Sequence, residues 1–226
     1  MVVKAAESAP HEQLQQGSPS LLHSVDAFDK SFSAWLYADG RSHLRGFLKF
    51  LEMSGTGSIW IPAIIALWLA PFDYPSALRA LAFNLLVGFL LDLALIGSIK
   101  GLARRTRPKY NREFSVLVPV DVYSFPSGHA SRAIFIASFL CFCIYANKGS
   151  FLTGTSAASA CSLVAFWAAC TASSRVFLGR HYFLDVVAGC LLGILELVIM
   201  TTFLWVSETT STKYHSLLWQ RLKLLN

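Results

Sequence analysis

The chain has 226 residues, of which 54% are hydrophobic and only 14% are charged, and its mean hydropathy is +0.52. Soluble domains carry about a quarter charged residues, so this composition excludes an ordinary soluble domain and indicates an integral membrane protein. The net charge of +6 comes from Lys and Arg residues beside apolar segments rather than from one basic face, which argues against nucleic acid as a partner.

The N-terminal part precedes the first strongly apolar segment. Residues 1–20 are rich in Ser, Gln, Glu and Pro and are expected to be a disordered tail; they lack the apolar core of a signal peptide. Residues 21–54 are predicted to form amphipathic helices, broken at Gly40. These helices suit the headgroup layer of a membrane, and packing against the remaining helices is an equally good explanation of their pattern.

Five apolar segments follow that are long enough to cross a bilayer. The first is expected to bend near Gly55 and Gly57. The predicted fold class is therefore all-α, a polytopic membrane helix bundle of about five spans over residues 47–205, followed by an amphipathic tail at 206–226. The expected spans are 47–71, 77–99, 129–147, 155–177 and 183–205.

Small residues and cysteines constrain the contacts between these spans. The fourth span is rich in Ala and Ser, and the fifth contains Gly189-x-x-x-Gly193. Small residues let helix backbones approach closely, so these two spans are predicted to pack side by side; a homodimer through Gly189 and Gly193 is the alternative. The five cysteines all lie in apolar segments without Cys-x-x-Cys spacing, so neither a disulfide framework nor a zinc site is expected.

A strongly polar stretch, residues 174–185, separates the last two spans and reads Ser-Arg-Val-Phe-Leu-Gly-Arg-His-Tyr-Phe-Leu-Asp. His181 and Asp185 are four residues apart, a spacing that places both on one helix face. A carboxylate there can fix the tautomer of the imidazole and leave its other nitrogen free to attack. Arg175 is always charged and suits two phosphate oxygens. Taken alone, the stretch fits equally well a snorkelling arginine and an incidental salt bridge.

The second span runs into another basic cluster, Lys-Gly-Leu-Ala-Arg-Arg-Thr-Arg-Pro, at residues 100–108. Lys100 and Arg107 at a helix exit can converge on one anion from two directions. The ordinary alternative is a topology signal, because positive clusters commonly flank membrane spans.

The third span begins with Phe-Pro-Ser-Gly-His at residues 125–129. Free backbone N–H groups and the helix dipole at such a start form a cradle for phosphate. Ser127 adds a hydroxyl, Gly128 lets an anion approach the backbone, and His129 is placed to give a proton to a leaving oxygen. The alternative is a helix cap followed by an interfacial histidine.

Together, the pattern Lys-x6-Arg-Pro, Pro-Ser-Gly-His and Ser-Arg-x5-His-x3-Asp resembles the signature of the type 2 phosphatidic acid phosphatase superfamily, which includes lipid phosphate phosphatases, glucose-6-phosphatase and vanadium haloperoxidases. The resemblance implies that His181 is a nucleophile forming a phosphohistidine, that Asp185 orients it, and that His129 acts as acid and then as base. It implies no metal and no other cofactor. It further implies a phosphate pocket of Lys100, Arg107, Ser127, Gly128 and Arg175.

The better-known lipid phosphate phosphatases of the superfamily have six spans, whereas five are predicted here. The sequence Phe-Pro-Ser-Gly-His-Ala-Ser-Arg is closer to the branch that acts on polyisoprenoid and presqualene diphosphates. Arg132 is expected either to contact the second phosphoryl group of a diphosphate or to snorkel to the headgroups. Asp92 and Glu196, inside the spans, are expected to face the bundle interior as structural hydrogen-bond partners, with Asn84, Asp92 and Lys100 on one helical stripe.

The sequence thus predicts a lipid phosphate or diphosphate phosphatase whose partners are its lipid substrate and the membrane. The alternatives are a phosphatase of a non-lipid ester, a haloperoxidase, a non-enzymatic scaffold, and a serine peptidase using Ser127, which would lack a Gly-x-Ser-x-Gly elbow. The three polar clusters fall on one side of the membrane, as do most of the other Lys and Arg residues. The positive-inside bias therefore predicts a site facing the cytoplasm. The expected membrane is that of the endoplasmic reticulum.

Overall fold

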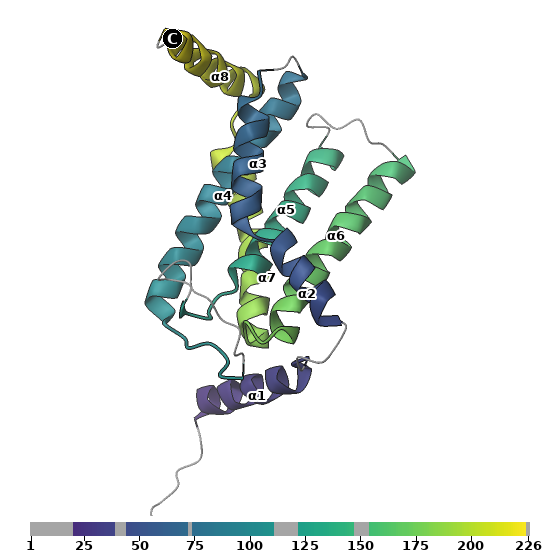
Figure 1. Ribbon diagram of the computed structural model, residues 1–226, viewed down its shortest axis with the longest axis vertical. Helices are drawn as coiled ribbons and strands as arrows, with labels where there is room; N and C mark the ends of the chain where they lie inside the picture. Colours follow the sequence, from purple (N-terminus) through teal and green to yellow (C-terminus); the bar gives the residue numbers. More distant parts are fainter. Residues whose placement is uncertain (1–19, 39–43, 72–73, 111–121, 147–153, 225–226) are drawn as a thin grey trace, which may run out of the picture.

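The structure is a computed structural model that describes residues 20–38, 44–71, 74–110, 122–146 and 154–224. The described residues form a bundle of helices (Figure 1), which confirms the all-α class; the predicted tail up to residue 19 and the predicted break at Gly40 lie outside them. The helices are α1 Leu21–Leu36, α2 Leu44–Ser54, α3 Gly57–Leu69, α4 Ser76–Ala103, α5 Gly128–Tyr145, α6 Gly154–Phe177, α7 Phe183–Ile199 with its π-helical continuation η2 Met200–Leu204, and α8 Glu208–Lys223.

Among the described residues, four helices, α4, α5, α6 and α7 with η2, are long and apolar enough to cross a membrane. Helices α2 and α3 are bent by 42° at their break, and they make the predicted fifth span if the pair counts as one broken span. The break lies at Gly55 and Thr56, where the sequence predicted a bend. A side chain at Gly55 would not fit, because its Cβ would lie 2.7 Å from Cγ2 of Thr171 in α6.

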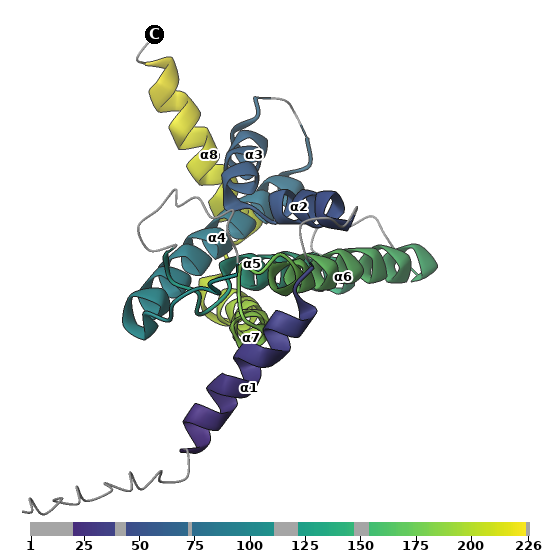
Figure 2. The ribbon, with the colours of Figure 1, turned by 60° about the horizontal axis from the view of Figure 1, so that its bottom comes forward.

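Helix α5 occupies the centre of the bundle. Figures 1 and 2 show it between α4 and α6, with α7 alongside. Its inner face supplies Phe135 and Phe139 to an apolar core that also contains Phe89 of α4 and Met200 of η2, all nearly or fully inaccessible to solvent. The middle of α5 is therefore anchored in the apolar core of the bundle.

The glycines of α7 pack against α5, so the predicted side-by-side packing of the fourth and fifth spans through them is wrong. A Cβ at Gly193 would overlap the Ser131 carbonyl oxygen and lie 3.0 Å from the Phe135 nitrogen, and a Cβ at Gly189 would overlap the Ser127 carbonyl oxygen. Small residues permit such close helix approach, but the sequence did not specify the partner helix. Because α5 of the same chain covers this face, a homodimer through the two glycines is excluded in this fold.

Gly193→Ala is expected to destabilise the bundle. Its methyl group would force α5 and α7 apart, and overpacking of this kind costs about 1–3 kcal/mol. The melting temperature of the detergent-solubilised protein should fall by several degrees. The matched control is Gly97→Ala in α4, where nothing lies within 4 Å of the Cβ position. An equal melting temperature for the two variants would contradict the packing.

Helices α1 and α8 lie at opposite ends of the bundle (Figure 1). Helix α1 turns a polar face to the bundle, since Asp29 and Ser33 are buried while Leu22 and Trp35 are 82% and 77% exposed. The packing of this helix against the bundle is confirmed, and its place in the headgroup layer stays a prediction that the outward apolar face supports. The predicted helix in the tail is α8, where Trp219 donates to the Leu69 carbonyl oxygen at 3.3 Å.

Candidate active site

A tight loop between α6 and α7 positions His181. Helix α6 ends at Phe177, and Gly179 follows with a φ of +68°, a conformation that glycine adopts readily. The backbone N–H groups of Arg180 and His181 then turn back to the Arg175 carbonyl oxygen at 2.9 and 3.2 Å. The imidazole is consequently held inside the protein, with His181 only 1% exposed.

The two ring nitrogens of His181 have different surroundings. Nδ1 lies 2.6 Å from the backbone carbonyl oxygen of Ser124. A carbonyl oxygen can only accept, so Nδ1 must carry the proton and Nε2 must carry the lone pair. Nε2 lies 3.4 Å from Nη1 of Arg107. The lone pair of His181 on Nε2 therefore accepts a long hydrogen bond from a cationic group.

This geometry corrects the expected contact between Asp185 and His181. The nearest approach, from Oδ2 to Nδ1, is 3.9 Å, which is too long for a hydrogen bond. Asp185 is the third residue of α7, and its carboxylate caps the helix by accepting from the Tyr182 backbone N–H at 2.9 Å. It also accepts from Nη1 of Arg105 at 2.6 Å. The Ser124 carbonyl, which carries no side-chain signal, takes the place expected for Asp185.

Arg105 links two helices next to the site, a role that the sequence analysis did not predict. Its Nη2 donates to Asp29 of α1 at 2.8 Å while Nη1 binds Asp185, so one side chain joins α1 to α7. Its backbone carbonyl accepts from the Ser124 N–H at 2.8 Å, which places the Ser124 carbonyl against His181. The only hint in the sequence was its position between Lys100 and Arg107.

Three cations surround the imidazole. Arg107 lies nearest, and Lys100 and Arg175 are each only 3% exposed. Arg107 also donates to the Arg180 carbonyl oxygen at 2.8 Å, which fixes it against the loop. Burial, and then the positive charges of Arg107, Arg175 and Lys100, lower the pKa of His181 well below its usual value of 6.5. At neutral pH the ring is therefore uncharged.

The start of α5 closes the site. Ser127 precedes the first helical residue, Gly128, so the first N–H groups of the helix have no partner within it. The Ser127 N–H donates to the Asp185 backbone oxygen at 2.9 Å, which ties α5 to α7. Ser127 Oγ is buried with no hydrogen-bond partner among the described residues. His129 follows in the first turn, half-buried.

Glu52 of α2 is a second residue that the sequence did not single out. Its Oε1 lies 2.7 Å from Nη1 of Arg175 and 3.1 Å from Nε of Arg180. A carboxylate therefore sits against a guanidinium that was predicted to bind phosphate. The available signal was weak, because Glu52 lies outside every motif, as one acid on an amphipathic helix just before Gly55.

Arg132 is neither exposed to the headgroups nor free of other contacts. It is only 7% exposed, which excludes snorkelling, and its Nη2 pairs with Oδ2 of Asp92 at 2.6 Å. Glu196 accepts from Ser131 Oγ at 3.0 Å. The structural roles expected for both acids are confirmed, and Asn84 likewise bonds to the Val206 backbone, through Oδ1 at 2.8 Å and Nδ2 at 2.9 Å.

Fold and site together define a polytopic helical membrane protein with a buried, uncharged histidine inside a cationic pocket. The family model of the PAP2 superfamily matches residues 81–208, which include every predicted site residue. The chain belongs to this superfamily. That membership covers all three polar clusters and four of the membrane-spanning helices, from most of α4 to the end of η2.

The proteins similar to the chain include two curated proteins and two solved structures. "Probable lipid phosphate phosphatase beta" of Arabidopsis thaliana is 36% identical over 204 residues, covering 80% of this chain and 91% of that protein. Undecaprenyl-diphosphatase of Sulfolobus acidocaldarius is 29% identical over 152 residues, covering 66% of each. A PAP2-type phosphatidylglycerolphosphate phosphatase of Bacillus subtilis shares the fold with a TM-score of 0.64, at 22% identity, over 80% of this chain and 86% of its own. Aquifex aeolicus LpxE also shares the fold, with a TM-score of 0.55 and 22% identity, over 76% of this chain and 94% of its own.

Proposed function

We propose that the chain is an integral membrane phosphatase that removes phosphate from lipid phosphates or diphosphates through a phosphohistidine at His181. The observation that carries the proposal is the fixed tautomer of His181, whose Nε2 lone pair lies 3.4 Å from Arg107 inside the cationic pocket. A neutral imidazole is a nucleophile, whereas an imidazolium is not. The cations stabilise the charge that spreads over the phosphoryl oxygens.

The reaction divides into two steps. In the first, Nε2 of His181 attacks phosphorus, the bond from phosphorus to the lipid oxygen breaks, and His129 gives that oxygen its proton. In the second, His129 takes a proton from water, the water oxygen attacks phosphorus, and the bond to Nε2 breaks. Inorganic phosphate leaves and both histidines return to their starting states. Asp185 acts in this scheme as a positioning residue that holds α7 and Arg105.

Lipid substrates are supported by the membrane-spanning helices and by the names of the two relatives. One is called a lipid phosphate phosphatase and the other an undecaprenyl-diphosphatase, so both monophosphates and polyisoprenoid diphosphates are candidates. Arg132 supports a diphosphate, because its guanidinium, paired with Asp92 through Nη2, lies beside the cradle, with Nη2 4.0 Å from the Cβ position of Gly128. Arg132→Ala should then lower kcat/KM more for farnesyl diphosphate than for farnesyl monophosphate, by roughly tenfold or more.

The purified protein, assayed in EDTA, tests the proposal. We expect phosphate release from at least one of phosphatidate, lysophosphatidate, farnesyl diphosphate and presqualene diphosphate, with inhibition by vanadate and none by serine-directed reagents. Release from water-soluble sugar phosphates alone would favour a non-lipid phosphatase. Activity restored only by a divalent cation would contradict the metal-independent mechanism.

Glu52→Gln should strengthen the binding of phosphate analogues. The Glu52 carboxylate contacts Arg175 at 2.7 Å and competes with an anion for the same guanidinium, and a hydrogen bond to a charged group contributes about 1.5–3 kcal/mol. The inhibition constant of vanadate should fall by roughly tenfold. The control is Glu208→Gln, in α8 at the far end of the bundle (Figure 1). Weaker vanadate binding in Glu52→Gln would mean that Glu52 positions Arg175 rather than competing with phosphate.

We further propose that the site faces the cytoplasm, from the endoplasmic reticulum membrane, because Lys and Arg residues gather on the side of the site. Helix α1 lies at that end of the bundle and α8 at the other (Figure 1). In sealed microsomes, a protease added outside should remove an N-terminal tag and spare a tag that has been placed in the 147–153 connection. The reverse pattern would place the site in the lumen.

A further inference from the structure

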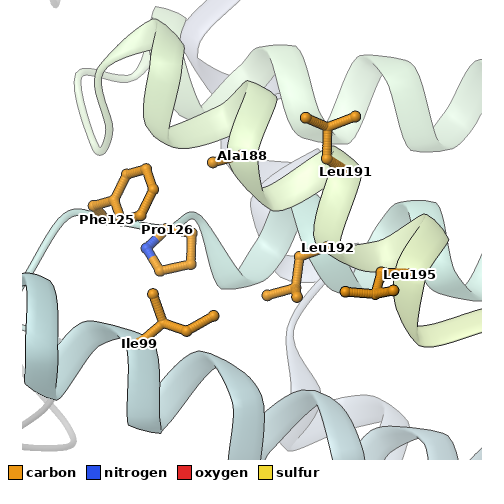
Figure 3. Close-up of a pocket in the computed structure, with 7 residues that line it drawn as sticks. All are labelled: Ile99, Phe125, Pro126, Ala188, Leu191, Leu192 and Leu195. Carbon is orange, nitrogen blue, oxygen red and sulfur yellow. The ribbon is translucent and has the colours of Figure 1, made fainter. Parts of the chain in front are cut away.

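An apolar groove runs between α4 and α7. It has a volume of about 260 Å³ and is lined by hydrocarbon side chains from three segments. Figure 3 shows Phe125 and Pro126 at one end, Ile99 of α4 on one wall, and α7 on the other wall as far as Leu195. Leu195 is 50% exposed, so the groove opens at the side of the bundle, where α7 faces lipid.

The groove adjoins the candidate active site, because two of its lining residues are chain neighbours of the phosphate pocket. Pro126 precedes Ser127 and Gly128 directly, and Ile99 precedes Lys100. Ile96, one turn before Ile99, lies 3.3 Å from the Cβ position of Gly128. The inner end of the groove is therefore built from the immediate neighbours of two residues, Ser127 and Lys100, that were assigned to the phosphate pocket.

The chemistry of the groove selects one kind of occupant. Its lining offers no charged side chain, so a headgroup would lose its hydrogen bonds there. Ala188 and Leu195 on α7 are seven residues apart, which corresponds to about 10 Å along the helix. The shape is thus an apolar channel that starts at the phosphate cradle and follows a membrane-spanning helix, the course that a chain attached to a bound phosphate would take.

We propose that this groove binds the hydrocarbon chain of the substrate while its phosphate lies in the cationic pocket. The proposal rests on the proposed lipid phosphatase function and adds the path of the chain. Lipid tails are as apolar as the groove, so burial adds no hydrophobic driving force. The groove instead orients the chain through van der Waals contact, and it should discriminate between substrates by chain length.

Ala188→Trp is the direct test, because an indole at this half-buried position would fill the groove near the cradle. The matched control is Ile194→Trp on the same helix, since Ile194 is 51% exposed and lies outside the groove lining. Both variants and the wild type are assayed in mixed micelles with dioleoyl phosphatidate and with dihexanoyl phosphatidate. The measured quantity is the ratio of kcat/KM for the long chain to that for the short chain.

We expect Ala188→Trp to lower this ratio by roughly tenfold or more, because the long chain loses the whole groove whereas the six-carbon chain reaches only its inner end, and Ile194→Trp to leave the ratio unchanged. Equal ratios in the two variants would overturn the proposal and would mean that bilayer lipid, rather than the substrate chain, fills the groove. If Ala188→Trp does not fold, Leu195→Trp at the outer end decides, because it should impair dioleoyl but not dihexanoyl phosphatidate. A wild type that acts on diphosphates but not on phosphatidate is compared on farnesyl and isopentenyl diphosphate instead, with the same expected ratios. A wild type that releases phosphate from none of these lipids would overturn the lipid phosphatase function itself, which separates the two failures.

Discussion

His181→Ala should abolish phosphate release, with a fall in kcat of about 10⁴-fold or more. No other described group combines a fixed lone pair with the three cations, since Nδ1 is held by Ser124 and Nε2 faces Arg107. Truncation removes the attacking atom and leaves the cationic pocket intact. Vanadate binding, measured by calorimetry on the purified variant, should therefore survive within about tenfold while turnover does not.

The control for this variant is His215→Ala. His215 lies in α8, at the other end of the bundle, with Nδ1 2.7 Å from Arg79 Nη1. It should keep near-wild-type turnover. Full activity in His181→Ala would contradict the mechanism. Loss of both activity and vanadate binding would instead indicate that the pocket had collapsed.

His129→Ala should show the second largest effect, and its size should depend on the leaving group. General acid catalysis contributes about 10²–10⁴-fold, so kcat on phosphatidate should fall by that amount, because an alkoxide leaves poorly without a proton. On p-nitrophenyl phosphate, whose leaving group needs no proton, the loss should be far smaller. The placement of His129 in the first turn of α5, directly after the cradle, is the reason for assigning it this role.

The two substrates serve as each other's control for His129→Ala. Retained activity on p-nitrophenyl phosphate would show that the variant is folded and still forms its pocket. Equal losses on both substrates would contradict the role of acid and would leave His129 as a residue that shapes the site.

Much of the site was predictable because its residues lie in three short motifs, each at the end of a membrane span. The alternation of apolar segments and polar junctions fixed which ends meet, so Lys100, Arg107 and Arg175 could be assigned to one pocket with His181. The structure buries Lys100, Arg175 and His181, and the charges of both cations act on the imidazole. The bend near Gly55 was predictable for a similar reason, since two closely spaced glycines interrupt an otherwise apolar segment.

The hydrogen-bond partner of His181 was not predictable. The i, i+4 spacing of His181 and Asp185 favours a direct contact only if both lie on one helix, but His181 precedes the start of α7 at Phe183. The carboxylate then caps the helix, and a backbone carbonyl reaches the imidazole instead. Backbone groups have no residue-type signal, so only the fold could reveal Ser124.

Contacts across long stretches of sequence were also invisible. Glu52 and Arg175 are far apart in the chain, and neither hydropathy nor spacing links them. Gly189 and Gly193 correctly predicted a close helix contact. Which helix they face depends on how the whole bundle packs around α5, and the sequence did not indicate this. The sequence thus specified which surfaces are small or charged and left the pairing of those surfaces to tertiary packing.

The central claim, a covalent intermediate on His181, is tested most directly by trapping it. The wild type is mixed with phosphatidate labelled at phosphorus, quenched in alkali within the first turnovers, digested, and mapped by mass spectrometry. We expect a phosphoryl group on the peptide containing His181, stable in alkali, lost in acid, and missing from His181→Ala. A phosphoryl group on Ser127, or steady turnover with no labelled peptide at any quench time, would contradict it.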